Sequence, residues 1–244
     1  MKTIGLIGGM SWESSAHYYA ILNRETARIR GGLHSAPVIL HSVDFAPIEA
    51  LQRAGDWDGA GQVLAGIARG LEAQGAGVIG LATNTMHICA PQIVAALGVP
   101  FVHIAAPTAE ALLADGIGRV GLLGTRFTME QPFYADILRG QGLEVLVPDV
   151  GITNLNGIIY EELCLGIVRD ASRQVYVEAI GRLMARGASW LEKVQLGQPS
   201  PSVPGHIAPA TSTGTAAFNA SSSTVAAASP LFPVRSTLVA PMLP

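Results

Sequence analysis

Three neighbouring polar side chains, Thr83, Asn84 and Thr85, follow an apolar run that ends at Leu81. The run has the length of a buried strand, and the pattern after it, at residues 88–97, indicates a helix. A loop of hydroxyl and amide groups between a strand and a helix presents hydrogen-bonding groups at the edge of a sheet, where α/β proteins bind ligands. Such residues are also common at the start of a helix, so a capping role stays open.

A second candidate is the turn Gly8-Gly9-Met10-Ser11, which lies between an apolar segment and an expected helix. The free N–H groups and the dipole at the N-terminus of a helix favour a carboxylate or a phosphate. The turn lacks the G-x-G-x-x-G pattern, and no acidic residue follows about 20 residues later at a strand end, so a dinucleotide fingerprint is excluded. Taken alone, the glycines are explained more simply as turn formers.

The elements that would position these residues alternate along the chain. The spacing of apolar residues predicts strands at 2–7, 38–43, 78–81, 101–104, 119–123 and 143–147, and helices at 12–30, 47–55, 59–74, 88–97, 108–115, 128–140, 158–165 and 171–186. Ser11 or Ser14 is expected to cap the first helix, and Thr128 with Gln131 has the spacing of a capping box. This alternation predicts parallel sheets with helices on both faces.

The pattern restarts near residue 119, where a strand again ends in a turn that contains glycine. We therefore expect an α/β fold of two similar Rossmann- or flavodoxin-like lobes with parallel sheets and a cleft between them. Residues 1–100 are assigned to the first lobe and residues 101–190 to the second, which would be incomplete.

Composition excludes several classes of protein. The net charge is -3 and no run of Lys or Arg is present, so neither nucleic acid nor an anionic membrane is an expected partner. No apolar window is long enough for a membrane span, and the N-terminal run is too short and too rich in glycine for a signal peptide. The chain has two cysteines, which indicate no disulfide framework and no metal cluster. A reducing cytoplasm is the expected location.

The composition changes after about residue 190. Residues 191–244 contain eight of the fifteen prolines but only three charged residues, and no helical or strand period is sustained. Such a segment cannot bury enough apolar surface to offset the cost of ordering the chain, so we expect it to be disordered. The abruptness of the change suggests a non-native tail, produced by reading a GC-rich gene out of frame.

Before that point the chain carries a series of motifs at residues 4–14, 33–35, 41–45, 83–87, 122–126, 128–131 and 161–166. In this order they resemble the motifs of the aspartate/glutamate racemase family, and in particular of its broad-specificity amino-acid racemase branch. The resemblance covers residue 1 to about residue 190.

The resemblance implies a cofactor-independent racemase that binds a small amino acid, such as aspartate or glutamate, between two lobes. Two cysteines, one per lobe, would face opposite sides of the α-carbon; one thiolate removes a proton and the other thiol returns one. The family pattern also implies substrate-binding residues, which in this chain are Met10, Ser11, Gln52, Thr83, Asn84 and Thr85. Since family members form dimers, a homodimer is a further expectation.

The two catalytic cysteines do not carry over to this chain. The first would lie directly before Thr83, where the chain has Ala82. The second belongs to a Gly-Cys-Thr-Glu motif that the chain lacks. Racemase activity is therefore expected to be lost or impaired, and the alternative is a non-catalytic protein that binds an amino acid or another small carboxylate.

No other residue is a good substitute for the missing thiols. Cys89 lies seven positions after Ala82, roughly 10 Å further along a helix, and we expect it to pack in the interior, as we do Cys164. His87 ends the polar loop and would either brace it or face the ligand. Three further histidines are expected to be structural: His34, His41 and His103.

Overall fold

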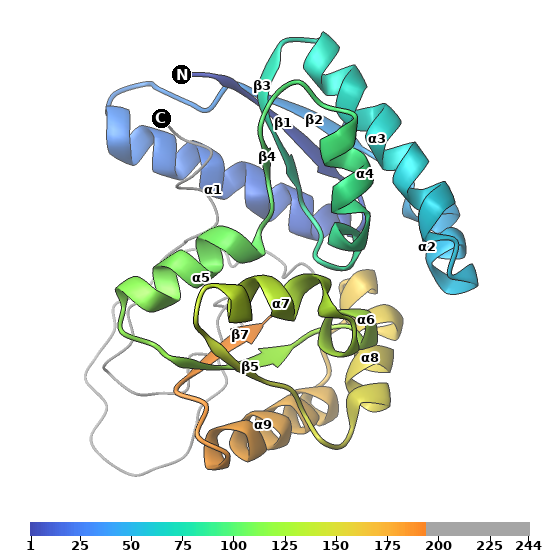
Figure 1. The fold of residues 1–244 in the computed structure, drawn as a ribbon, viewed down its shortest axis with the longest axis vertical. Helices are drawn as coiled ribbons and strands as arrows, with labels where there is room; N and C mark the ends of the chain where they lie inside the picture. Colours follow the sequence, from blue (N-terminus) through green and yellow to red (C-terminus); the bar gives the residue numbers. More distant parts are fainter. Residues whose placement is uncertain (194–244) are drawn as a thin grey trace.

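The computed structural model describes the backbone of residues 1–193 and the side chains of residues 1–189. These residues form two lobes, each built on a parallel sheet, which lie one above the other in Figure 1. The predicted α/β fold with parallel sheets is therefore confirmed. Residues 194–244, for which the sequence predicts a disordered tail, lie outside the described residues.

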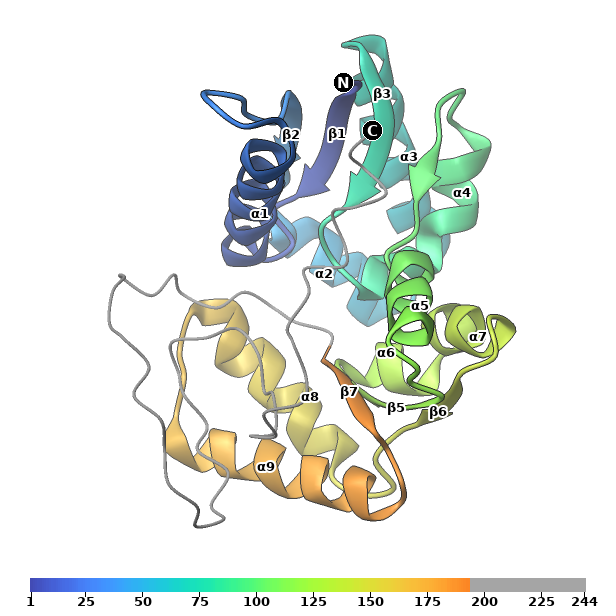
Figure 2. The same cartoon turned by 90° about the vertical axis from the view of Figure 1, so that its left-hand side faces the viewer.

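The first sheet has the strand order β2-β1-β3-β4. Its strands are β1 (Thr3–Gly8), β2 (Val38–Ser42), β3 (Ala76–Leu81) and β4 (Phe101–Val102). One face is covered by α1 (Trp12–Arg30), and the other by α3 (Trp57–Ala73) and α4 (Ala90–Ala95), with α2 (Phe45–Ala54) beside them (Figure 2). Alternate residues of β3 enter the two apolar cores: Val78 packs on the α1 side and Ile79 on the α3 side.

The second sheet has the order β6-β5-β7. Its strands are β5 (Arg119–Leu123), β6 (Glu144–Leu146) and β7 (Trp190–Lys193). The helices α5 (Ala105–Ala114) and α7 (Pro132–Gly140) lie on one side of it, and α8 (Ile152–Glu161) and α9 (Asp170–Ala185) on the other (Figure 2). The short helix α6 (Arg126–Glu130) follows β5 and contacts both α7 and α8, with Met129 in the core on the α8 side. Two 3-10 helices complete the described elements, η1 (Thr85–Cys89) and η2 (Leu163–Leu165).

Two boundaries differ from those expected. The change from the first sheet to the second falls after Val102 rather than at residue 100, because β4 pairs with β3. Residues 191–193, which the composition assigned to the tail, belong to β7 and pair with β5. Ser189 leads into that pairing, since its N–H donates to Arg119 O at 3.1 Å. Hydrogen bonds between main-chain groups do not depend on the type of side chain, so this pairing could not be predicted from the pattern of apolar and polar residues.

Two of the expected helices are divided. The helix predicted at 128–140 is α6 followed by α7, because Pro132 cannot continue a helix and begins a new one instead. Thr125 caps α6 by accepting the N–H of Thr128, so Thr128 is not the cap that the capping-box spacing predicted. The helix predicted at 88–97 is η1 followed by α4.

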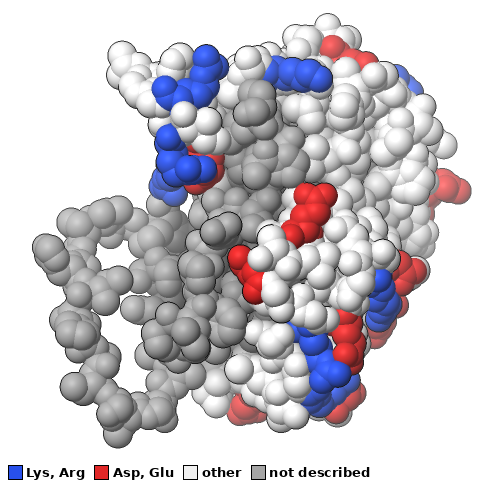
Figure 3. Space-filling view, turned by 60° about the vertical axis from the view of Figure 1, so that its left-hand side comes forward, with Lys and Arg blue, Asp and Glu red and all other residues white. Residues whose placement is uncertain are grey.

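Charged side chains are sparse and scattered on the surface shown in Figure 3, where basic groups gather at the upper left and both signs mix at the lower right. Many of the charges pair with a neighbour one helical turn away, as Arg28 does with Glu25 and Arg139 with Asp136. Exposed pairs of this kind contribute little to stability. Within the described residues, no helix is long and apolar enough to cross a membrane.

Candidate functional site

The two candidate segments lie side by side because β1 and β3 are neighbours in a parallel sheet. The Ile7–Leu81 pair ends the ladder, and the N–H of Ala82 donates to Ile7 O at 2.8 Å. The turn after β1 and the polar loop after β3 therefore begin at the same edge of the sheet. This is the edge at the carboxyl ends of the strands, where open α/β sheets bind ligands.

The turn after β1 is held in a conformation that glycine alone can adopt. Gly9 has φ 93°, and a Cβ atom there would lie 2.3 Å from Val43 O, directly after β2. The sequence suggested that the N–H groups of this turn are free to bind a ligand. The N–H of Gly9 instead donates to Ser15 Oγ at 2.8 Å and is not free. The buried Ser15 hydroxyl donates in turn to Ser11 O.

Ser11 caps α1 and has a strained backbone. Its Oγ accepts the N–H of Ser14 at 3.3 Å, which selects Ser11 from the two expected caps. It has φ 127° and is the one non-glycine residue of positive φ within residues 1–193. Strain of this kind is found at functional sites more often than elsewhere. The neighbouring Met10 is buried in the core between the first sheet and α3.

The polar loop after β3 is buried. Ala82 is 0% exposed and packs against Leu6 and Leu22 on the α1 side of the sheet. The three following residues are 6% to 8% exposed. Asn84 occupies the capping position of η1, but its side chain makes no capping hydrogen bond. The capping interpretation of Asn84 is therefore wrong, and its amide is not used to start the helix.

The third residue of the loop joins the two lobes. Thr85 Oγ1 lies 2.9 Å from Thr125 Oγ1, which follows β5 in the second sheet. Thr125 Oγ1 also lies 3.1 Å from Thr128 Oγ1. The carboxyl ends of β3 and β5 thus meet through buried hydroxyl groups. A few residues away, the rings of Trp57 and Phe127 also meet across the lobes, edge to face, with centroids 5.2 Å apart.

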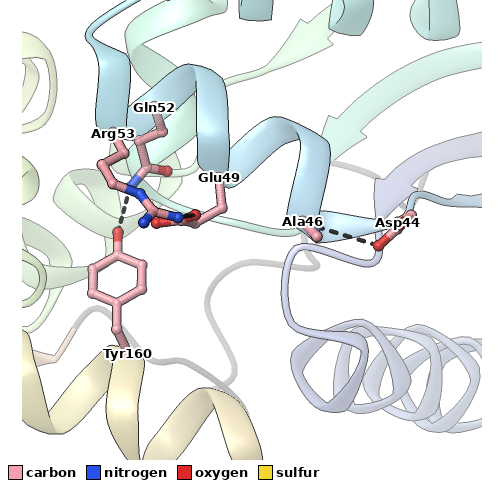
Figure 4. A network of polar contacts seen from close by, with 6 residues as sticks. All are labelled: Asp44, Ala46, Glu49, Gln52, Arg53 and Tyr160. Atoms are coloured by element: carbon pink, nitrogen blue, oxygen red, sulfur yellow. Dashed lines mark hydrogen bonds and ion pairs between the residues drawn. The ribbon is translucent and has the colours of Figure 1, made fainter.

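A second polar contact crosses between the lobes at Gln52. Its Nε2 donates a hydrogen bond to the hydroxyl of Tyr160, which reaches up from α8 (Figure 4). Gln52 is buried, whereas its neighbours Glu49 and Arg53 form an ion pair on the more exposed side of α2. Burial raises the pKa of Tyr160 to about 12, so this hydroxyl is neutral at physiological pH.

Comparison with known proteins identifies the family to which this chain belongs. The family model described as Asp/Glu/Hydantoin racemase matches residues 7–198. The chain belongs to this racemase family.

Solved structures agree with this assignment. One from Yersinia pestis, whose name places it among the Asp/Glu racemases, is 49% identical with a TM-score of 0.73, and the match covers 80% of this chain and 85% of that one. An aspartate racemase homologue from Pyrococcus horikoshii is 32% identical with a TM-score of 0.66, covering 80% and 86%.

A curated relative matches over a shorter segment. It is the broad specificity amino-acid racemase RacX of Bacillus subtilis, 35% identical over 79 residues. The match spans 32% of this chain and about a third of the relative, 34% of its length.

The two cysteines of this racemase-family chain have unreactive thiols. Cys89 is fully buried in the core and its Sγ donates to Trp57 O at 3.6 Å. Cys164, in η2, is partly buried, whereas the sequence analysis expected it to pack in the interior. Burial raises the pKa of each thiol to about 11, with the Asp58 carboxylate adding to the effect at Cys89. Both are therefore protonated and poorly nucleophilic at neutral pH.

Two residues that join the lobes beside this candidate site, Thr125 and Tyr160, were not predicted from the sequence. Thr125 lies in a family-like motif directly after a predicted strand, and this strand-end position was the available signal. Tyr160 lies inside α8, where no spacing rule distinguishes a helical residue that faces the other lobe. Within residues 1–193, no group of three or more metal-ligating side chains is present.

Proposed function

We propose that this racemase-family chain binds a small amino acid at the carboxyl ends of β1 and β3, and that its proton transfer at the α-carbon is lost or strongly impaired. The observation that carries the proposal is the residue at the end of β3, Ala82, which adjoins the polar loop. The family resemblance implies a catalytic cysteine at this position and calls for no cofactor.

The binding half of the proposal rests on the polar groups beside Ala82. The hydroxyls of Thr83 and Thr85 suit a carboxylate, and the Asn84 amide can serve both the carboxylate and the ammonium group. Burial of all three makes each hydrogen bond to a charged ligand stronger than it would be in water. The turn that contains Met10 and Ser11 begins at the same edge and is proposed to form the opposite side of the site. The Met10 side chain is buried in the core, so its contribution would come from the main chain.

The catalytic half rests on what a racemase needs at the α-carbon. A thiol can serve as base and as acid because its pKa is close to neutral. The methyl group of Ala82 can do neither. Cys89 and Cys164 are unsuited as replacements because each thiol has a pKa of about 11. They also lie in η1 and η2, away from the end of β3 where Ala82 lies. A displaced base would also transfer protons slowly, because the reaction depends on close placement of the reacting atoms.

Two further parts of the proposal concern location and assembly. The cytoplasmic location follows from the low cysteine count, and the homodimer follows from the family resemblance alone. Size-exclusion chromatography with light scattering tests the dimer directly.

Calorimetric titration with L-aspartate and L-glutamate tests the binding half. The expected result is saturable binding of at least one of them, weakened about tenfold or more by Asn84→Ala, since a hydrogen bond to a charged group is lost. His41→Ala, on the exposed edge strand β2, is a matched control that should bind like the wild type. Absence of binding in the wild type refutes this half.

The catalytic half is tested on the same samples by following deuterium uptake at the α-carbon in D₂O. Binding without uptake supports the proposal, whereas uptake well above the buffer blank shows that the chain retains a working base.

A further inference from the structure

The side chain of His87 lies between the polar loop and the segment where the chain passes from one lobe to the other. It is 1% exposed. Its Nδ1 lies 2.7 Å from Thr83 O, and its Nε2 accepts the N–H of Ile104 at 3.4 Å. A single imidazole ring therefore contacts two main-chain groups that are 21 residues apart.

These contacts determine where the ring carries its proton. Because the N–H of Ile104 points at Nε2, that nitrogen must be an acceptor without a hydrogen. The proton then lies on Nδ1, which donates to the carbonyl of Thr83. The neutral form with hydrogen on Nδ1 is the one state of the ring that satisfies both partners.

The surroundings favour this neutral form. The ring of His103 lies 4.3 Å from the His87 ring between centroids, and that of Phe101 lies 5.7 Å away. Burial, helped by the nearby His103, holds the pKa of His87 well below its usual value. His103 is the titratable group facing His87, and its own Nδ1 accepts the N–H of Ala105, at the start of α5.

The two partners of His87 have different positions in the fold. Thr83 begins the polar loop of the first lobe. Ile104 follows β4, the last strand of the first sheet, and its side chain packs in the core of the second lobe. The segment at Ile104, where the chain crosses from the first lobe to the second, is called the crossover here. One ring thus connects the crossover to the loop proposed to bind an amino acid.

We propose that His87 is a positioning residue that couples the amino-acid-binding loop to the crossover between the lobes. The inference rests on the proposed function of the loop and assigns no contact between His87 and the ligand. Any displacement of Thr83 on binding is transmitted through the ring to Ile104. The ring also keeps Thr83 and Asn84 in place before the ligand arrives.

The variant His87→Asn separates coupling from simple support. An Asn side chain retains an N–H donor close to the position of Nδ1, and is too short to reach Ile104. It is expected to hold the loop but to lose the connection to the crossover. L-aspartate should then bind about fivefold more weakly, the effect of losing one hydrogen bond. His41→Asn, on the exposed edge strand, is the matched control.

NMR spectra of the ¹⁵N-labelled full chain, with and without saturating L-aspartate, give a readout that a purely structural role would not move. The Ile104 amide should shift on binding in the wild type and in His41→Asn, and should stay in place in His87→Asn although the ligand still binds. Long-range ¹H–¹⁵N spectra of the free wild type should show hydrogen on Nδ1 of His87.

Each outcome decides a separate point. If the wild type binds neither L-aspartate nor L-glutamate, the proposed function fails and the coupling fails with it; if it binds L-glutamate alone, the same spectra are recorded with L-glutamate. If it binds while the Ile104 amide stays unchanged, or shifts equally in His87→Asn, only the coupling is refuted. Hydrogen on Nε2 refutes the coupling even where His87→Asn cannot be purified.

Discussion

Ser11 combines a left-handed backbone, a buried hydroxyl and a position beside the polar loop. A non-glycine residue at such a φ costs on the order of 1–3 kcal/mol, while loss of an N-cap costs about 1 kcal/mol. Ser11→Ala keeps the strain and loses the cap, so it should unfold about 1 kcal/mol more easily. Ser11→Gly relieves the strain and should be at least as stable as the wild type. Urea unfolding of the three chains measures both, and equal losses would refute strain at this residue.

His87 and His103 give the protein a predictable response to acid. Burial lowers the pKa of His103 to about 4 and that of His87 well below 6.5. The unfolded chain therefore takes up protons first, and stability falls as the pH drops below about 6.5 and continues to fall down to about 4. With about 1.4 kcal/mol per pKa unit, His103 alone contributes on the order of 3 kcal/mol to this fall.

The free energy of unfolding in urea, measured at pH 7.5, 6 and 5, tests this response. His103→Asn keeps an acceptor for the N–H of Ala105 but does not titrate, so its stability should fall less steeply. A wild-type curve that is flat over this range, or one that His103→Asn leaves unchanged, would contradict the assignment of neutral histidines.

Individual residues were predicted unevenly. Thr83, Asn84 and Thr85 were found because polar residues after an apolar run mark a strand end, and strand ends meet at one edge. The engagement of the Gly9 N–H by Ser15 was not predictable, because it depends on how the first turn of α1 folds back. Gln52 and Met10 were named as substrate-binding residues from the family resemblance alone, since no spacing rule identifies them. The contact of Gln52 with Tyr160 and the burial of Met10 in the core were not predicted.

At the level of elements, the strand and helix sequence was predictable because each element carries a clear apolar period. The exceptions have local causes. Pro132 divides a periodic stretch into α6 and α7, and β7 is held by its pairing with β5 rather than by its own composition. The contact between α2 and α8 could not be foreseen, because Gln52 and Tyr160 are 108 residues apart.

The contact between these two helices should contribute to the association of the lobes. Tyr160→Phe removes the acceptor of the Gln52 amide and leaves that buried side chain unpaired, which costs about 1–2 kcal/mol. Tyr19→Phe, at an exposed position of α1, is the matched control and should change stability by less than about 0.5 kcal/mol. Thermal unfolding of both variants measures the difference. Equal melting temperatures for the two variants would show that the contact between α2 and α8 is not a stabilising one.

On the scale of the whole molecule, the family match continues to residue 198, into the segment where the composition changes. We propose that the sequence beyond about residue 190 results from a change of reading frame. One of the other two frames of the gene should then encode a Gly-Cys-Thr-Glu-like motif followed by an amphipathic helix. Reading the DNA past codon 190 tests this. The hypothesis is ruled out if neither of the other two frames encodes such a motif.

Loss of the native end of the second lobe would also affect solubility. Within the described residues β7 is at the edge of its sheet, and an unprotected edge strand pairs readily with other chains. A chain carrying the restored frame should therefore aggregate less than the present one. The two lobes themselves were predictable from the restart of the strand and helix pattern, whereas the contacts that join them at Thr85 and Gln52 were not.

The central claim is that the site after β3 binds an amino acid but has no base, and the sharpest measurement compares the wild type with Ala82→Cys. Both are incubated with the amino acid that binds, in D₂O, and the α-carbon is followed by NMR and by chiral chromatography. The wild type should show no exchange above the buffer blank. A thiolate at position 82 should remove the α-proton and return a deuteron to the same face, giving exchange with retention and no opposite enantiomer. Exchange or racemisation by the wild type at rates well above the blank would contradict the account.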